Sequence, residues 1–438
     1  MSLCCTPTNK KSVFPLSLLT LAIFSSTALA AENKYTCQQL DKLNTRSQQV
    51  VTPPSICESL IGDVNGWRSA LADNGWGVQL SWNPTILYDL RDQQRDPQEY
   101  SGQNFTWAQT MALNVTYDLG RIGFSKDAQL TISPQWSTSN YQDGYPRLHN
   151  IATLAVNQPF LDGQIELQYG FYPLIRQFYG MILGGNSSSA ALGPTSVIPV
   201  QVGISLNAPT PTFTFIARDS DKKLYNNFAV SRSMSPKGHL DDVEQNPYGL
   251  KWHVDGANPI LVNEVGYKQD ASDTERSLWF RAGGIYNTSH YDYYDKPGDS
   301  SDNYAFYVAN TVQLTQPQLG LPLGLYLDTK VNYAPDDRNA YTSDFQVTLF
   351  DIGLFPGRQQ DMTSLGYTRS FISHKFRDSL KPADLEAPQS INAISLSHAF
   401  RLTTGIYWIN GITWQDNPTL VPKRDDAVLY QSSMYWNF

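Results

Sequence analysis

The sequence predicts an all-β protein, a transmembrane antiparallel β-barrel of the bacterial outer membrane preceded by a short helical segment. Three observations carry this prediction: a secretory leader, side-chain alternation sustained over most of the chain, and a last strand with an aromatic face. The chain has 438 residues, 12% aromatic and 16% charged, with a mean hydropathy of −0.36. After the leader no apolar run reaches the ~18 residues of a spanning helix, so strands must do any crossing.

Residues 1–30 form the predicted signal peptide. Lys10 and Lys11 precede an apolar run at 13–24, and residues 28–30 read Ala-Leu-Ala, a small-x-small cleavage site. The leader holds no acid, so its removal takes the formal net charge from −8 to −10. The acidity argues against nucleic acid as a partner. An exported chain without a membrane helix is either secreted or an outer-membrane barrel, and its length without a composition break favours a barrel in the cell outer membrane.

Residues 31–75 are predicted to be an N-terminal periplasmic segment with a disulfide and one short helix. Cys37 and Cys57 lie in a polar stretch without a nearby His, which favours a bridge over metal binding in an oxidising compartment. Two free thiols are the alternative. Asp63 or Asn65 can cap a helix near Trp67, and Asn-Gly at 74–75 supplies a left-handed stop.

From Trp76 to the end, apolar and polar residues alternate as in a half-buried strand, so residues 76–438 are the predicted barrel. In the first strand the apolar positions are Val78, Leu80, Trp82, Ile86 and Tyr88, and the polar ones are Gln79, Ser81, Asn83 and Thr85. A soluble sandwich also alternates. Segments of barrel-strand length recur, however, and they are joined by short turns such as 161–163 and by long loops such as 91–102 and 291–302. This arrangement favours a membrane barrel.

The number of strands stays open on pattern alone. About eighteen candidates follow Trp76, of which those near 197–206, 228–232 and 248–254 are weak. Bacterial barrels have even strand numbers, which leaves sixteen or eighteen, and either size is expected to enclose an aqueous lumen.

The last predicted strand, residues 427–438, has one apolar and one polar face. Val428, Tyr430, Met434, Trp436 and Phe438 share one parity, interrupted only by a Ser at 432. Aromatic residues at the membrane interface and a terminal Phe are typical of a closing barrel strand. An edge strand of a soluble sandwich is the alternative for this segment taken alone.

Three stretches resemble motifs of the carbohydrate-selective porin (OprB) family. Residues 62–68 read Gly-Asp-Val-Asn-Gly-Trp-Arg, similar to the family's Gly-Asp-Trp-Gly-Gly-x-Arg but with Val and Asn at two positions. Residues 353–361 read Gly-Leu-Phe-Pro-Gly-Arg-Gln-Gln-Asp and match Gly-Leu-Phe-Pro-Gly-Arg-x-x-Asp. Residues 264–267 and 283–286 are similar to a Glu-x-x-Tyr and Gly-x-x-Tyr strand pair.

The resemblance implies a sixteen-stranded barrel that lets mono- and oligosaccharides diffuse passively, with a sugar preference and without a cofactor. We expect outer-membrane lipid around the barrel, and the sequence leaves open whether the chain forms a homo-oligomer. The alternative function is a general or anion-preferring porin for small organic acids, because lumen arginines attract carboxylates.

Sugar passage needs aromatic faces and exchangeable hydrogen-bonding groups in the lumen. The candidate pore-lining, sugar-contacting residues are Trp279, Arg281, Arg218, Glu166, Asp328, Lys330 and Arg358. Arg281 with Trp279 is the favoured pair, and Arg358 lies in a turn where a salt bridge to Asp361 is expected. Each residue could also be an ordinary solvated lumen charge.

Enzyme readings find no support in the sequence. The six histidines are scattered, and none has metal-ligand spacing or a neighbouring nucleophile motif. We therefore expect no catalytic residues and no metal site.

Overall fold

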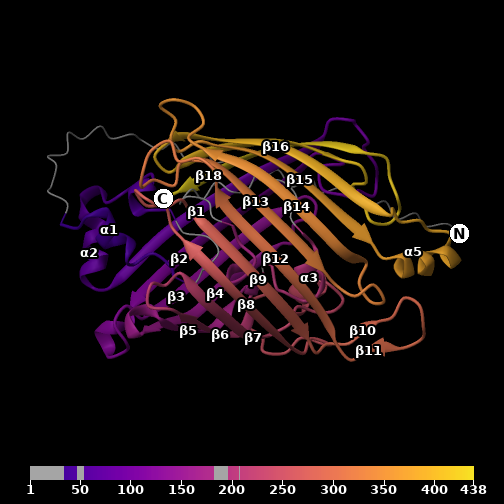
Figure 1. Cartoon of the computed structure of the whole chain (residues 1–438), viewed down its shortest axis with the longest axis horizontal. Coiled ribbons are helices and arrows are strands. Elements are labelled where there is room, and N and C mark those ends of the chain that lie inside the picture. The colour runs from indigo at the N-terminus through magenta and orange to yellow at the C-terminus, as the bar shows by residue number, and fades with distance from the viewer. Residues whose placement is uncertain (1–33, 47–53, 182–195, 207) are drawn as a thin grey trace, which may run out of the picture.

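The computed structural model describes residues 34–46, 54–181, 196–206 and 208–438, so the predicted leader lies outside the described residues. In this part of the chain sixteen antiparallel strands close into one barrel, each pairing with its neighbour along the chain, and the last pairing with the first (Figure 1). The described residues contain no helix long and apolar enough to cross a membrane.

The barrel strands are β1 (Trp76–Asp89), β2 (Thr106–Asp118), β3 (Gln129–Ser139), β4 (Leu148–Phe160), β5 (Ile165–Tyr172), β6 (Thr210–Arg218), β7 (Leu224–Arg232), β8 (Pro259–Gln269), β9 (Leu278–Asn287), β12 (Asn303–Gln313), β13 (Gly324–Tyr333), β14 (Tyr341–Ile352), β15 (Met362–Ile372), β16 (Ser390–Thr403), β17 (Ile406–Gln415) and β18 (Ala427–Asn437). A small hairpin pairs β10 (Tyr291–Asp292) with β11 (Asp299–Ser300). The helices are α1 (Cys37–Asp41), α2 (Trp67–Asp73), α3 (Ile198–Gln201), α4 (His239–Gln245) and α5 (His374–Leu380).

The barrel has sixteen strands, which decides between the sixteen and eighteen left open by the sequence. Two of the three weak strand predictions are wrong. Residues 228–232 do belong to a strand, β7. Residues 197–206 instead contain α3, and 248–254 form a loop without strand pairing. An apolar run buried inside a barrel can resemble a strand in sequence, which explains the first error.

Alternation places the apolar side chains on the outside, as predicted. Trp82 of β1 pairs with Met111 of β2 on one side and with Trp436 of β18 on the other. These outward rings and chains form the apolar band that a membrane barrel presents to lipid. The inward neighbour Thr85 is buried and hydrogen-bonds Ser433 across the β1–β18 closure, at 2.8 Å between hydroxyl oxygens.

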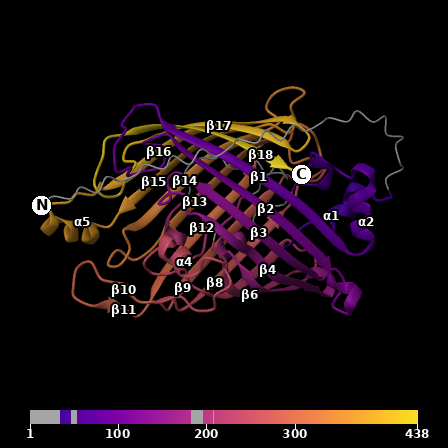
Figure 2. The same ribbon diagram turned by 180° about the vertical axis from the view of Figure 1, so that it is seen from behind.

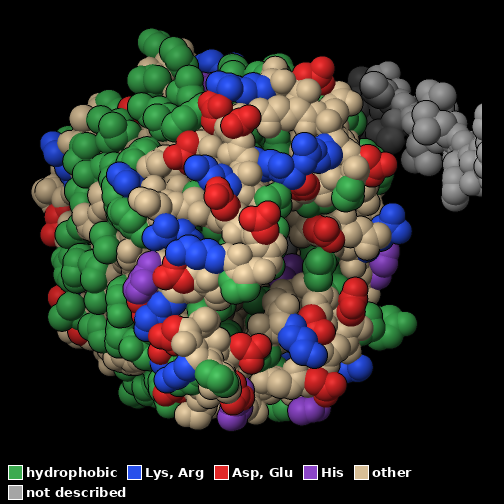
Figure 3. Space-filling view, turned by 90° about the vertical axis from the view of Figure 1, so that its right-hand side faces the viewer, with side chains coloured by type: hydrophobic (Ala, Val, Ile, Leu, Met, Phe, Trp, Pro, Cys, Tyr) green, Lys and Arg blue, Asp and Glu red, His purple; other side chains and the backbone are tan. Residues whose placement is uncertain are grey.

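The two ends of the barrel differ. At the turn end, strands are joined by short connections such as 161–164 and 404–405, and α1, α2 and the carboxyl end gather there (Figure 1). At the loop end lie the long connections, with α5 and the β10–β11 hairpin; Figure 2 shows the same division from behind. Seen end-on, the loop end carries intermixed basic and acidic side chains around a hollow (Figure 3).

The N-terminal segment is fastened to the turn end. Cys37 and Cys57 form the disulfide that the sequence predicts, with Cα atoms 5.7 Å apart. Asp63 accepts hydrogen bonds from the backbone N–H groups of Arg68 and Ser69, so it caps α2 from outside the helix.

Arg68 joins this segment to the barrel closure. Its guanidinium donates to the carbonyl oxygens of Gly62, Val78 and Phe438, and the last of these bonds is 2.7 Å long. Burial lowers the pKa of Arg68, although Asp63 opposes this effect. The first strand and the last residue are therefore held by one side chain.

The lumen is not empty, because one loop folds into it. We call residues 173–181, 196–206 and 208–209 the inner loop; it follows β5 and precedes β6. Its apolar side chains form the main buried core with inward residues of the barrel wall. The members from the loop are Leu174, Phe178, Ile198, Val202 and Ile204, and those from the wall include Ala229, Ile260, Val262, Ile285, Ala305 and Tyr307. The sequence predicted an aqueous lumen throughout, whereas the inner loop fills the side next to β7–β13.

Candidate functional site

The open side of the lumen is lined by uncharged polar side chains of β1–β3, which we call the neutral wall. A cavity of about 370 Å³ lies against it. The hydroxyl and amide side chains that line this cavity from the three strands are Gln79, Ser81, Thr110, Asn114, Ser133, Gln135 and Ser137, while β4 contributes Leu148 and Ala152. These groups both donate and accept hydrogen bonds, as a polyhydroxylated solute requires.

Arg176 is the charged residue among the described residues that line this cavity. It belongs to η5 (Leu174–Arg176) of the inner loop, and its Nη1 donates to Thr153 Oγ1 at 3.1 Å. Burial lowers the pKa of Arg176 to about 10, so the guanidinium stays protonated at neutral pH. Sequence reasoning missed this residue because nothing in the alternation shows that residues after β5 turn inward.

The opposite side of the lumen is covered by the inner loop, and its inward ionic side chains are Glu264, Lys268, Arg281, Asp328, Lys330 and Asp344. We call them the charged wall; they stand on β8, β9, β13 and β14. Strand register aligns Lys330 and Arg281 on either side of Ala309. Asp328 lies between the two cations, 2.7 Å from Lys330 Nζ and 3.9 Å from Arg281 Nη2.

The favoured pair, Trp279 and Arg281, does come together. The Arg281 guanidinium carbon lies 4.0 Å from the centre of the Trp279 ring, and Lys268 Nζ lies 4.6 Å from the same centre. Stacking on an indole partly compensates a cation for lost water. Trp279 and Lys330 are 3% exposed, while Arg281 and Asp328 are 0% exposed. These four candidates are therefore buried side chains, and their contact with a passing sugar stays a prediction.

Glu264 is the centre of a buried polar cluster that sequence reasoning named only as part of a motif. Its carboxylate accepts hydrogen bonds from the hydroxyls of Tyr225 at 2.6 Å and Tyr307 at 2.7 Å. Trp279 Nε1 donates to the Tyr225 hydroxyl at 2.8 Å, which links this cluster to the cation stack. Only cross-strand register reveals such contacts, since the four residues come from four strands, β7, β8, β9 and β12.

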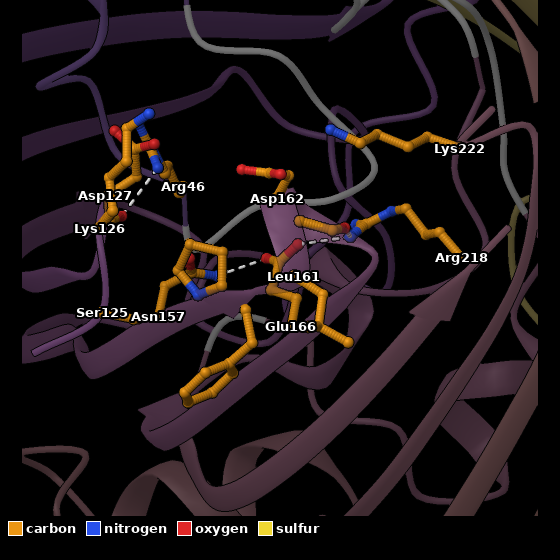
Figure 4. A pocket seen from close by; sticks show the side chains of 13 residues that line it. Arg46, Ser125, Lys126, Asp127, Asn157, Leu161, Asp162, Glu166, Arg218 and Lys222 are labelled. Carbon is orange, nitrogen blue, oxygen red and sulfur yellow. Dashed lines mark hydrogen bonds and ion pairs between the residues drawn. The ribbon is translucent and has the colours of Figure 1, made fainter. Parts of the chain in front are cut away.

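Glu166 and Arg218 form an ion pair at the turn end. Arg218 Nη1 lies 2.8 Å from Glu166 Oε2, and Asn157 donates to the other carboxylate oxygen at 2.5 Å. They border an open cleft of about 920 Å³, on whose other side Arg46 and Asp127 lie (Figure 4). These two candidates thus mark one mouth of the barrel, away from the buried stack.

Arg358 pairs with Asp361 within its turn, as expected. Its Nη2 donates to Asp361 Oδ1 at 3.0 Å and to the Arg401 carbonyl at 3.1 Å. The hydrogen bond to Asp361 raises the pKa of Arg358. Arg358 is exposed at the turn end, so the seven predicted residues fall into three separate places.

The described residues contain no group of three or more His, Cys, Asp or Glu side chains that could hold a metal ion. The arrangement instead offers a path lined by hydrogen-bonding groups, beside a buried ionic wall. A closed antiparallel barrel of sixteen strands with an apolar exterior, a folded-in loop and a polar open lumen defines a porin of the outer-membrane type.

Comparison with known families places the chain more closely. Residues 107–429 match the family described as "Carbohydrate-selective porin, OprB family". The chain therefore belongs to the carbohydrate-selective porin OprB family, and it is a sugar-favouring porin. No curated protein sequence matches the chain.

Solved structures agree on the fold. The high-pH structure of Pseudomonas putida OprB is similar with a TM-score of 0.70 and 15% identity, covering 87% of this chain and 98% of that one. The low-pH structure of the same protein has a TM-score of 0.55, with the same identity and coverage. Salmonella typhi OmpF in complex with daunomycin has a TM-score of 0.52 and 9% identity, covering 84% and 99%.

Proposed function

We propose that small neutral sugars cross the outer membrane passively, along the open side of the lumen between the neutral wall and Arg176. The observation that carries this proposal is the lining of the 370 Å³ cavity, where hydroxyl and amide side chains of β1–β3, interspersed with alanines, face one guanidinium. A sugar can exchange its water hydrogen bonds for these groups one at a time, so it is neither excluded nor trapped.

The same lining argues against a route built for organic acids. Arg176 attracts a carboxylate. The neutral wall opposite Arg176, however, carries no charge that would favour an anion over an uncharged solute of equal size. In our proposal the barrel is a channel without catalytic chemistry. Its turn end faces the periplasm, and its outward apolar side chains contact outer-membrane lipid. Cross-linking in intact membranes measures whether the chain forms a homo-oligomer.

Liposome swelling tests the proposal directly. Purified protein is reconstituted, and entry rates are measured for monosaccharides, disaccharides, zwitterionic amino acids and organic acids of matched size. We expect sugars to enter faster than size-matched zwitterions. Rates ordered by size alone indicate a general porin, and rates ordered by negative charge indicate the anion-preferring alternative; either result overturns the proposal.

Arg176→Gln locates the preference within the lumen. This variant keeps a hydrogen-bonding side chain beside Thr153 and removes the cation, so we expect the sugar preference to fall while the barrel stays folded. Arg121→Gln is the matched control, because Arg121 is an exposed arginine at the turn end. Equal sugar preference in both variants would remove Arg176 from the path.

A further inference from the structure

Tyr179 of the inner loop has an unusual backbone conformation. Its φ is +61°, in the left-handed region that side-chain-bearing residues rarely adopt. Such a conformation persists only where surrounding contacts hold it, and it then often marks a functional position. Tyr179 lies three residues after Arg176, on the side of the loop that faces the charged wall.

Four contacts hold Tyr179 against that wall. Its N–H donates to Glu264 Oε2 at 3.4 Å, and its hydroxyl accepts from Asn332 Nδ2 at 2.7 Å. Its ring meets the Tyr307 ring edge-on at 5.2 Å between centroids, and Lys330 Nζ lies 5.5 Å from its centre. The backbone, the hydroxyl and the ring of Tyr179 are thus all in contact with the barrel.

The barrel is shaped to keep Glu264 in place for this contact. The two tyrosines that donate to Glu264 lie across glycines on neighbouring strands. A Cβ at Gly266 would come within 2.4 Å of Tyr225, and one at Gly283 within 2.2 Å of Tyr307. Larger residues at these two positions would push both hydroxyls away from the carboxylate. Glu264 is 1% exposed, so the carboxylate depends on these donors for the hydrogen bonds that water would otherwise supply.

We propose that Glu264, Tyr225 and Tyr307 are positioning residues of the pore: they clamp Tyr179, and through it they fix Arg176 and the width of the open lumen. The clamp sets the largest sugar that passes. The inference rests on the proposed function only in using sugars as probes of width.

The rest of the inner loop has its own attachments, so the clamp controls a limited part of it. Gln201 exchanges two hydrogen bonds with the Tyr341 backbone, at 2.8 and 2.9 Å. Asn287 donates to the Val202 carbonyl at 2.8 Å. Within the stretch from η5 to Tyr179, Gln177 donates to Gln168 at 2.7 Å and accepts from Asn227 at 3.0 Å. Loss of the clamp should therefore loosen the Tyr179 end of this stretch most, displace Arg176 less, and leave α3 attached.

Glu264→Gln is the decisive variant. The amide keeps the shape of the side chain but carries no charge, and its NH₂ cannot accept from a tyrosine hydroxyl. In planar bilayers we expect frequent current substates where the native channel is steady. In liposome swelling we expect the ratio of trisaccharide to monosaccharide entry to rise about fivefold, as for the loss of one net hydrogen bond.

Tyr100→Phe is the matched control, because it removes a buried tyrosine hydroxyl that donates to a carboxylate, Asp89, at 2.6 Å but lies near the loop end of β1. It should leave substates and size ratio unchanged. If Glu264→Gln fails to fold, judged by heat-modifiable gel migration, Tyr225→Phe and Tyr307→Phe each remove one donor and should show smaller shifts of the same sign. A folded variant with native current and native size ratio overturns the proposal.

A double-mutant cycle tests whether the clamp acts through Arg176. Arg176→Gln is made in the native and in the Glu264→Gln background, and its effect on sugar entry is compared. We expect the effect to shrink in the second background, because Arg176 is then no longer held in one place. Equal effects in both backgrounds overturn the link to Arg176. Ionic current reports the clamp even if the native channel shows no sugar preference, so failure of the proposed function remains distinguishable.

Discussion

The two walls of the lumen differ in the partners that their polar side chains find. The neutral wall of β1–β3 carries hydroxyls and amides beside a cavity, whereas the charged wall of β8, β9, β13 and β14 carries six ionic side chains under the inner loop. The hydroxyls and amides of the first wall pair with one another, as Thr110 with Ser137 and Ser133 with Asn114, and they lie beside space that water and solutes can enter. The second wall lies under the inner loop, where ion pairs, tyrosine hydroxyls and the indole beside two cations supply partners for its ionic groups.

Because of this difference, the same kind of substitution should destabilise the protein by different amounts in the two walls. Removing a hydroxyl from a wall that water can reach costs little, because water replaces the lost partner. Removing one member of a buried ionic set leaves the others charged and unpaired, which is among the most destabilising changes in proteins. Direct contacts with a solute should therefore depend on the neutral wall, and barrel stability on the charged wall, which acts on permeation only through the position of the inner loop.

The largest expected effect is that of Asp328→Ala. Asp328 lies between Lys330 and Arg281 and accepts from Thr311 at 2.6 Å, so its loss leaves two buried cations without their carboxylate. We expect a loss of about 3–5 kcal/mol in unfolding free energy. The midpoint of urea unfolding, followed by heat-modifiable migration in lipid vesicles, measures it.

Ser133→Ala on the neutral wall is the control for this change. Ser133 is itself 2% exposed, but its hydroxyl donates to the neutral amide oxygen of Asn114 at 2.6 Å, so its loss leaves no buried charge unpaired and should cost at most about 1 kcal/mol. Similar midpoints for the two variants would refute the contrast between the walls.

The N-terminal segment braces the neutral wall at the turn end. Thr45 and Pro54 line the cavity, and Gln79 donates to the Pro54 carbonyl at 3.3 Å. Replacing both cysteines of the Cys37–Cys57 bridge by Ser should cost about 3 kcal/mol by the loop-closure estimate, confined to this segment. Trypsin should then cut after Lys42 or Arg46 in the folded barrel much faster than in native protein. Unchanged cleavage rates would show that the hydrogen bonds suffice without the bridge.

One substitution made in both walls gives the sharpest comparison. Asn114→Asp on the neutral wall keeps the acceptor that Ser133 uses, so we expect a shift of reversal potential toward cations with no loss of stability. Asn332→Asp on the charged wall loses the donor that serves both Tyr179 and Asp344 and puts two carboxylates side by side. That change should cost about 1–3 kcal/mol. Equal stability of the two variants would contradict the assignment of the walls.

Predictions from the sequence were more accurate for the lipid-facing side of the barrel than for the lumen. Lipid requires an apolar residue at every second position, so strands such as 76–89 could be identified from the chain alone, and the turn pair of Arg358 and Asp361 is local. Asp63 was one of the two caps proposed for α2, and the structure selects it.

The interior depends on distances that no local pattern contains. Residues 197–206 look like a weak strand because a buried apolar run satisfies a core equally well as helix or strand. The Glu264 cluster assembles through the register of β7, β8, β9 and β12, and Arg176 reaches the lumen only because the inner loop turns inward. Trp279 and Arg281 do lie together, but their burial follows from that same loop, and their contact with sugar remains a prediction.

The smallest expected effect concerns an ion pair that, unlike those of the charged wall, lies near solvent. Arg424 donates to both carboxylate oxygens of Glu99, at 2.6 and 2.5 Å, and so links the β1–β2 loop to the β17–β18 loop. This hydrogen bonding lowers the pKa of Glu99. A carboxyl whose folded-state pKa is depressed stabilises above its unfolded pKa and loses that contribution as pH falls through the folded value. Acid should therefore release the two loops, at a cost of at most about 1 kcal/mol, and salt should weaken the link already at neutral pH.

Hydrogen exchange of peptide 90–105, corrected for intrinsic rates, should increase in acid for native protein and be raised at pH 7 in Glu99→Gln. Exchange that responds to neither salt nor this substitution would mean that the loops are held by other contacts, while the buried Asp328 set should ignore salt in the same experiment.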